Sequence, residues 1–190
     1  MSQENILLGI DPGTSVLGYG VIKQVQQQLS AVQYGVIRLH RCATHTLKLK
    51  KIFEHVCMLV NDFIPDEVVL EAPFYGKNVQ SMLKLGRVQG VVMAAALVRE
   101  VPISEYSPRK IKQVVTGYGH ASKEQVARML MSLLQLPSIP DLLDASDALA
   151  VAVCHAYQSG RVSNKSKSWE QFVQANPVLV QHTQCTDALV

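Results

Sequence analysis

A short apolar segment near the N-terminus constrains the fold most strongly. Residues 6–10 read ILLGI and end at Asp11-Pro12-Gly13, a sequence that favours a tight turn. An apolar run of this length without polar alternation is typical of a strand that is buried on both faces. We therefore expect a central strand in a sheet that carries helices on each face, which is an α/β architecture.

Hydrophobic periodicity and turn signals predict four further strands and five helices. The strands are expected over residues 17–26, 31–39, 68–70 and 102–106, the first two as an antiparallel meander and the third beside residues 6–10. The helices are expected over residues 47–64, 79–99, 108–115, 122–134 and from Pro140 to about 159. The predicted fold is a five-stranded mixed sheet with helices on both faces.

The length of 190 residues, with 48% apolar and 17% charged residues, predicts one globular domain. We place this domain over residues 1–160 and a polar, partly flexible tail over 161–190, in which Trp169 and Phe172 are candidates for docking. The longest apolar stretch is far shorter than the roughly 20 residues of a membrane span. Residues 1–5 do not resemble a secretory signal, and four widely spaced cysteines suggest reduced thiols. These features predict a cytoplasmic protein that does not cross a membrane.

Positive charge is concentrated in one part of the chain. The formal charge is +3, but residues 107–128 hold five basic side chains and one acid, so this segment carries +4 and the remainder −1. Such a patch suits a polyanion such as nucleic acid. A solvated helix face is the alternative on charge alone.

Four acids stand at strand ends or on one predicted helix, where a metal-binding role can be weighed against a structural one. Asp11 closes the first strand, and Glu71 closes the fourth. Asp144 and Asp147 are three residues apart in an apolar segment, so a helix would place both on one face. Structural alternatives also exist, because Asp11 suits a turn, Glu71 a strand end facing water, and Asp144 the first turn of a helix. This last alternative suits Asp147 less well.

Taken together, the four acids suit a hard cation. Carboxylate oxygens without His or Cys favour Mg²⁺, with Mn²⁺ as the alternative. Two such ions about 3.5 to 4 Å apart can activate water and stabilise the leaving oxygen in phosphodiester cleavage. His155 lies further along the same predicted helix, and we expect it to be a packed helix residue and not a ligand.

The chain resembles the RuvC-type Holliday junction resolvases over about residues 6–160. The resemblance rests on LGIDPGT at 8–14, GYG at 18–20, LE at 70–71 with the following Phe74 and Lys77-Asn78, and DASDALA at 144–150. Further matches are LKLG at 83–86 with Gly90, Glu105-Tyr106, Lys112-Gln113, Gly117 with Gly119, and Lys123 with Gln125-Val126.

This resemblance implies an RNase H-like fold, a homodimer, and paired cuts in two like-polarity strands of a four-way DNA junction during recombination and repair. The cuts would leave 5′-phosphate and 3′-hydroxyl ends, with two Mg²⁺ ions per subunit. By position, the metal-binding catalytic acids would be Asp11, Glu71, Asp144 and Asp147, assisted by Lys123. The DNA-binding residues would be Phe74, which would stack on an unpaired base, and Lys77, Arg109, Lys112 and Lys123.

The same resemblance implies two kinds of protein partner. The helix that contains Gly86 and Gly90 is the candidate dimer interface, and a branch-migration motor of the RuvA and RuvB type is the candidate complex. Two other functions remain open at this point. One is a non-catalytic junction-binding module of the same fold. The other is an actin-like nucleotide binder, since GIDPGT at 9–14 also suits a phosphate loop.

Overall fold

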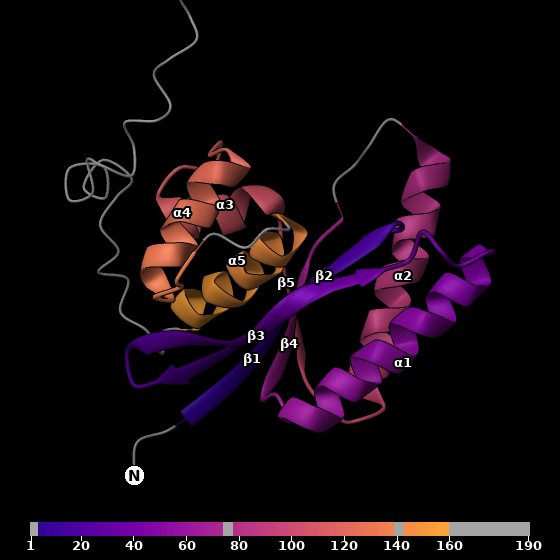
Figure 1. Cartoon of the computed structure of the whole chain (residues 1–190), viewed down its shortest axis with the longest axis horizontal. Helices are drawn as coiled ribbons and strands as arrows, with labels where there is room; N and C mark the ends of the chain where they lie inside the picture. The colour runs from indigo at the N-terminus through magenta and orange to yellow at the C-terminus, as the bar shows by residue number, and fades with distance from the viewer. Residues whose placement is uncertain (1–3, 74–77, 139–142, 160–190) are drawn as a thin grey trace, which may run out of the picture.

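A computed structural model describes residues 4–73, 78–138 and 143–159. Its five strands form one mixed sheet in the order β3-β2-β1-β4-β5 (Figure 1). The strands are β1 (Glu4–Asp11), β2 (Val16–Val25), β3 (Gln28–Arg38), β4 (Glu67–Glu71) and β5 (Ile103–Tyr106). β1 lies at the centre, antiparallel to β2 and parallel to β4, as its apolar sequence predicts.

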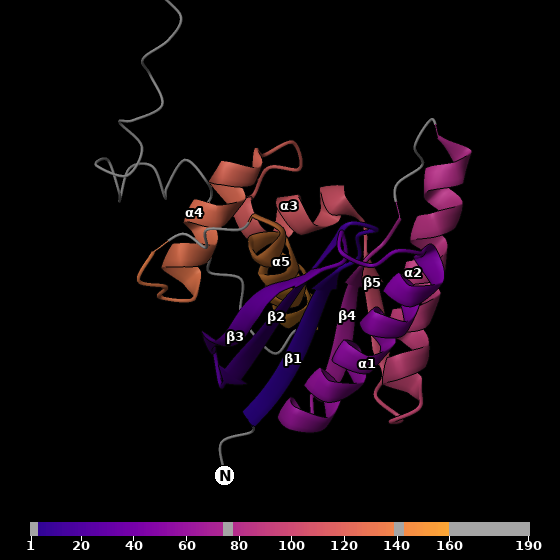
Figure 2. The same ribbon diagram turned by 45° about the vertical axis from the view of Figure 1, so that its right-hand side comes forward.

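Helices cover both faces of this sheet. The helices are α1 (His45–Phe63), α2 (Val79–Leu97), α3 (Pro108–Thr116), α4 (Lys123–Leu133) and α5 (Leu143–Gln158). Figure 2 shows α1 and α2 on one face and α3, α4 and α5 on the other. Alternate residues of β1 serve the two layers, because Leu8 and Ile10 join the core with α1 and α2, whereas Leu7 joins the core with α5.

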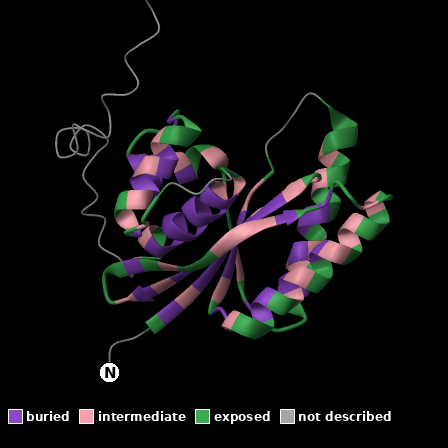
Figure 3. Cartoon of the chain, viewed as in Figure 1, coloured by how far each residue is buried: buried purple, intermediate pink, exposed green. Residues whose placement is uncertain are grey.

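Helix α5 is the most deeply buried helix, as the purple ribbon in Figure 3 shows. Glycines on β1 and β2 let it lie directly on the sheet. A Cβ atom on Gly9 would come within 2.2 Å of the carbonyl oxygen of Ala148, and one on Gly18 within 2.0 Å of the carbonyl oxygen of Asp144. Any side chain at these two positions would therefore push α5 away from the sheet.

The predicted strands and helices are confirmed, with small shifts at their ends. The largest shift is at β3, which begins at Gln28 because Gln26, with a φ of 56°, makes a two-residue turn directly after β2. α1 ends at Phe63, before Pro65, through a left-handed Ile64. The expected start of α5 at Pro140 and the tail over 161–190, with Trp169 and Phe172, lie outside the described residues.

Two further expectations, on the cysteines and on membrane spans, can be compared with the structure within the described ranges. Cys42, Cys57 and Cys154 are free thiols, of which Cys154 is buried. Among the helices in those ranges, none is long and apolar enough to span a bilayer.

Candidate active site

Three of the four predicted acids meet where β1 ends beneath α5. One carboxylate oxygen from each of Asp11, Asp144 and Asp147 can be chosen so that the three lie within 4.8 Å of one another. The close approach of α5 explains this convergence. Asp11 is paired with Gly18 across β1 and β2, and the backbone of Asp144 lies directly over Gly18. The bare glycine thus brings the first turn of α5 to the end of β1.

Glu71 lies beside this cluster and faces the same cavity. It ends β4, one residue beyond Leu70, which is paired with Ile10, the residue before Asp11. Asp11 and Glu71 therefore leave adjacent parallel strands at the same edge and on the same face. On the other side of the sheet, the buried Gln89 of α2 donates a 3.1 Å hydrogen bond to the carbonyl oxygen of Glu71, which holds the end of β4 in place.

Three of the acids, Asp11, Glu71 and Asp147, share a cavity of about 300 Å³ with two lysines. Apolar side chains from α3, α4 and α5 complete its wall. The lining residues are Asp11, Glu71, Pro108, Ile111, Lys112, Lys123, Val126, Asp147 and Ala150. The cavity therefore places carboxylates and ammonium groups around a space large enough for a small number of ions and water molecules.

The cavity disfavours full ionisation of its own acids. Burial raises the pKa of Asp11 to about 8, and the negative charges of Glu71 and Asp147 add to the shift. Burial also raises the pKa of Glu71 to about 7, followed by the effect of Asp147. Like charges held this close need a cation or a proton to offset them. The site is thus built for positive charge.

Lys123 supplies part of that charge from α4. Ser122 caps this helix and forms a capping box with Gln125, which fixes the first turn where Lys123 lies. Burial acts to lower the pKa of Lys123, but its hydrogen bond to the Asp147 carboxylate and the charge of that group outweigh burial, so the pKa is raised. Lys123 is therefore a firmly protonated group at the mouth of the site.

The remaining predicted binding residues are distributed differently. Lys112, on α3, is half-buried, lines the acid cavity and acts to lower the pKa of Glu71. Arg109 lines a separate shallow pocket with Ser107, Lys110 and Gln113. Phe74 and Lys77 lie outside the described residues.

The donor set fits a hard divalent cation. Within the described ranges, the one group of three or more potential metal ligands whose donor atoms lie within 4.8 Å of one another consists of carboxylates, with no His or Cys. Oxygen donors of this kind are those that Mg²⁺ and Mn²⁺ prefer. His155 is not part of the group and is buried elsewhere in α5.

The glycines that make this geometry are not among the predicted functional residues. Gly9 and Gly18 were noted within motifs, but their role in seating α5 was not predicted. A signal was present, because glycine inside a strand is unfavourable unless another backbone approaches closely.

The fold and the site place the chain in the class of RNase H-like proteins. A five-stranded mixed sheet of the RNase H-like type, with carboxylates converging from β1, β4 and α5, is the arrangement found here. The chain belongs to the crossover junction endodeoxyribonuclease RuvC family, whose family model matches residues 7–155.

Individual relatives agree with this membership. The crossover junction endodeoxyribonuclease RuvC of Cytophaga hutchinsonii is 55% identical over 174 residues, covering 92% of this chain and 87% of the relative. That of Christiangramia forsetii is 53% identical over 179 residues, covering 93% of each chain. Among solved structures, T. thermophilus RuvC in complex with Holliday junction substrate has a TM-score of 0.77 and 31% identity, covering 82% of this chain and 94% of that one.

Proposed function

We propose that this chain is a metal-dependent endonuclease that resolves four-way DNA junctions. The observation that carries the proposal is the convergence of carboxylates from Asp11, Asp144 and Asp147 beside a cavity that Asp11, Asp147, Glu71 and two lysines line. The similarity to T. thermophilus RuvC, solved with a Holliday junction substrate, supports the choice of substrate. Symmetric cuts in two like-polarity strands would leave 5′-phosphate and 3′-hydroxyl ends.

The four acids would hold two Mg²⁺ ions, with Mn²⁺ as a substitute. When bound, the ions would supply a Lewis acid for the scissile phosphate and lower the pKa of the attacking water. Asp11 would be one of these ligands, since burial and then the nearby charges of Glu71, Asp147 and Asp144 raise its pKa and a cation would offset them. Asp11 and Glu71, whose pKa values are raised, would release their protons as the ions bind.

The lysines would act on the DNA itself. Lys123 is partly exposed and donates to Asp147, so it can hold that carboxylate in place and present its remaining N–H groups to a phosphate oxygen. Lys112 faces the same cavity from α3 and would orient the strand for in-line attack. Arg109, from its own pocket, would bind the backbone further along, and Phe74 and Lys77 would contact the crossover.

A homodimer would place one such site on each strand. Support comes from α2, where a Cβ on Gly86 or Gly90 would meet nothing within 4 Å, and where Val79 and Leu83 are 68% and 57% exposed. An apolar helix face with exposed small residues can pack closely against its copy. The proposal also includes a cytoplasmic location, a nuclease domain over 1–160, and a complex with a branch-migration motor of the RuvA and RuvB type.

A synthetic mobile four-way junction tests the proposal. With Mg²⁺ we expect symmetric nicks that DNA ligase can reseal, and with a chelator none. Asp11→Asn should bind the junction without cutting it, whereas Asp62→Asn, at an exposed site on α1, should cut normally. Binding by the wild-type chain without any nicking would contradict the proposal and favour a non-catalytic junction-binding module.

A further inference from the structure

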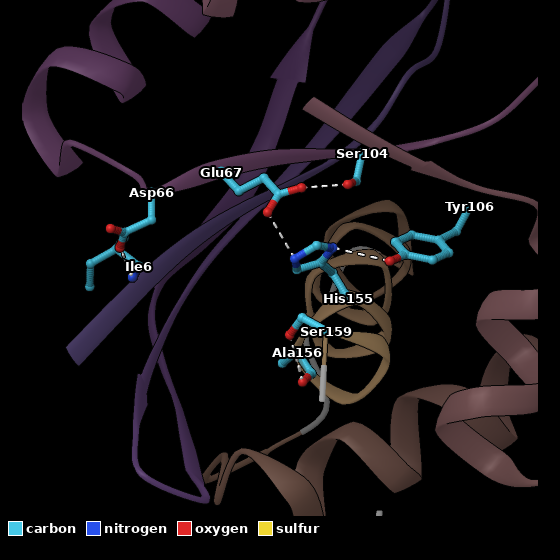
Figure 4. A network of polar contacts seen from close by, with 8 residues as sticks. All are labelled: Ile6, Asp66, Glu67, Ser104, Tyr106, His155, Ala156 and Ser159. Carbon is cyan, nitrogen blue, oxygen red and sulfur yellow. Dashed lines mark hydrogen bonds and ion pairs between the residues drawn. The ribbon is translucent and has the colours of Figure 1, made fainter. Parts of the chain in front are cut away.

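A second polar cluster lies at the other end of α5, away from the cavity. It joins Glu67 of β4, Ser104 and Tyr106 of β5, and His155 of α5 (Figure 4). The Nε2 atom of His155 is 3.0 Å from Oε2 of Glu67, and its Nδ1 atom is 3.1 Å from the Tyr106 hydroxyl. Ser104 donates a hydrogen bond to the other oxygen of Glu67.

These groups are enclosed and contact one another. The side chains of His155 and Glu67 are only 7% and 17% exposed. If the Tyr106 hydroxyl donates to Nδ1, the neutral ring carries its proton on Nε2, which lies 3.0 Å from one oxygen of Glu67, while Ser104 donates to the other oxygen. Buried polar groups that contact one another in this way resist a shift of their elements, because a shift would separate Nε2 from the Glu67 carboxylate.

The cluster connects the same two elements that carry candidate acids. Along β4, Glu67 and Glu71 are four residues apart on one face, about 13 Å at 3.3 Å per residue. Along α5, Asp147 and His155 are eight residues apart, about 12 Å at 1.5 Å per residue. The helix therefore meets the strand at two points with matching spacing: Glu71 is near Asp147, and Glu67 contacts His155.

We propose that Glu67, His155 and Tyr106 form a register clamp that positions Asp144 and Asp147 of α5 against Glu71 of β4. The clamp residues are positioning residues, since they do not line the acid cavity. This inference rests on the proposed metal-dependent cleavage.

The other contacts of α5 explain why a clamp is needed. Over β1 and β2 the helix lies on glycines, with the carbonyl oxygen of Ala148 and the Cβ atom of Ala152 over Gly9 and the side chain of Leu149 over Gly20. The backbone and alanine contacts set how closely the helix lies on the sheet, and among these glycine contacts Leu149 alone is a large side chain that resists sliding along the helix axis. Metal ligands must be held within about 0.5 Å of their working positions. The directional contact between His155 and Glu67 at the far end of α5 adds restraint against movement along the helix axis.

Metal affinity without DNA gives a direct test. Mn²⁺ binding, followed by the loss of the free-ion electron paramagnetic resonance signal, reports the ligand geometry independently of cleavage. For Glu67→Leu we expect Mn²⁺ affinity to fall about tenfold, the low end of what changes beyond the ligands cost a metal site. The Mg²⁺ concentration for half-maximal cleavage should rise by the same factor, while the cleavage rate at saturating Mg²⁺ stays within about twofold.

Conservative and control variants separate positioning from stability. Glu67→Gln should restore the affinity, because its amide oxygen can accept from Ser104 while its NH2 group donates to Nε2 of the other His155 tautomer, whose Nδ1–H then donates to the Tyr106 hydroxyl. Val56→Ala, in the core on the opposite face, should lower the melting temperature without changing Mn²⁺ affinity. If Glu67→Leu does not fold, Tyr106→Phe, which removes one hydroxyl, should show the same loss of Mn²⁺ affinity in smaller measure.

The outcomes distinguish the clamp from the proposed function. Wild-type affinity for Mn²⁺ in folded Glu67→Leu and Tyr106→Phe, beside a wild-type chain that binds the ion and cuts junctions, would overturn the clamp alone. A wild-type chain that neither binds Mn²⁺ nor cuts would overturn the proposed function instead.

Discussion

Replacing Asp11 by asparagine should stabilise the metal-free protein at alkaline pH. Folding raises the pKa of Asp11 to about 8, first through burial and then through Glu71 and Asp147, whereas the unfolded chain ionises this group near 3.8. A raised pKa in the folded state gives stability that is fully present below the unfolded value. That stability is lost as the pH rises through the folded value, so the wild-type chain weakens between about pH 4 and 8.

The interval between these two pKa values sets the magnitude. At about 1.4 kcal/mol per pH unit, the interval from 3.8 to about 8 gives a ceiling of about 6 kcal/mol. Asp11 remains partly exposed, so water and side-chain relaxation reduce the penalty, and we expect about 3 kcal/mol. For a chain of this size that corresponds to a rise in melting temperature of about 6 to 12 °C.

Thermal unfolding followed by circular dichroism, with a chelator present, measures this effect. The gain from Asp11→Asn should be large at about pH 8 and small at about pH 5. Saturating Mg²⁺ should remove it, because cations stabilise the wild-type acids and not the amide. Asp62→Asn should show no such dependence on pH. An Asp11→Asn variant no more stable than the wild type at pH 8 without metal would refute the electrostatic reasoning.

Further predictions concern the support of the acid cluster and the basic residues around it. Gly18→Ala should cost about 3 kcal/mol in unfolding free energy and abolish Mn²⁺ binding, because its Cβ would meet the Asp144 carbonyl oxygen, and calorimetry checks both. Lys123→Ala should slow cleavage about 10²-fold at saturating Mg²⁺ in single-turnover assays, and an unchanged rate would rule out its role at the phosphate. Arg109→Ala should weaken junction binding and lower by about one the slope of log binding constant against log salt concentration, which binding titrations measure. Lys112→Ala should weaken binding and also slow cutting, which nicking rates measure.

Much of the fold could be predicted because its signals are local. The unbroken apolar run of β1 and Pro65 after α1 act within a few residues. The convergence of Asp11 and Glu71 was also predictable, since both follow parallel strands and such strands end at one edge. The metal-binding and DNA-binding roles of the site residues stay predictions.

Features that depend on distant pairs could not be predicted. No local pattern shows that Gly18 lies under the first turn of α5, because that contact exists only after the sheet and helix have docked. His155 was expected to be a packed helix residue, and it is buried, but its partner Glu67 depends on the register between α5 and β4. The early start of β3 follows from a left-handed Gln26, a conformation that non-glycine residues adopt infrequently.

The position of α5 as the last described element also bears on synthesis by the ribosome. Asp11 and Glu71 emerge early in translation, but Asp144 and Asp147 follow only after more than two thirds of the chain has been made. A nascent chain that still lacks α5 cannot assemble the acid cluster. Cleavage that depends on this cluster can therefore begin only after α5 has left the exit tunnel and docked on the sheet.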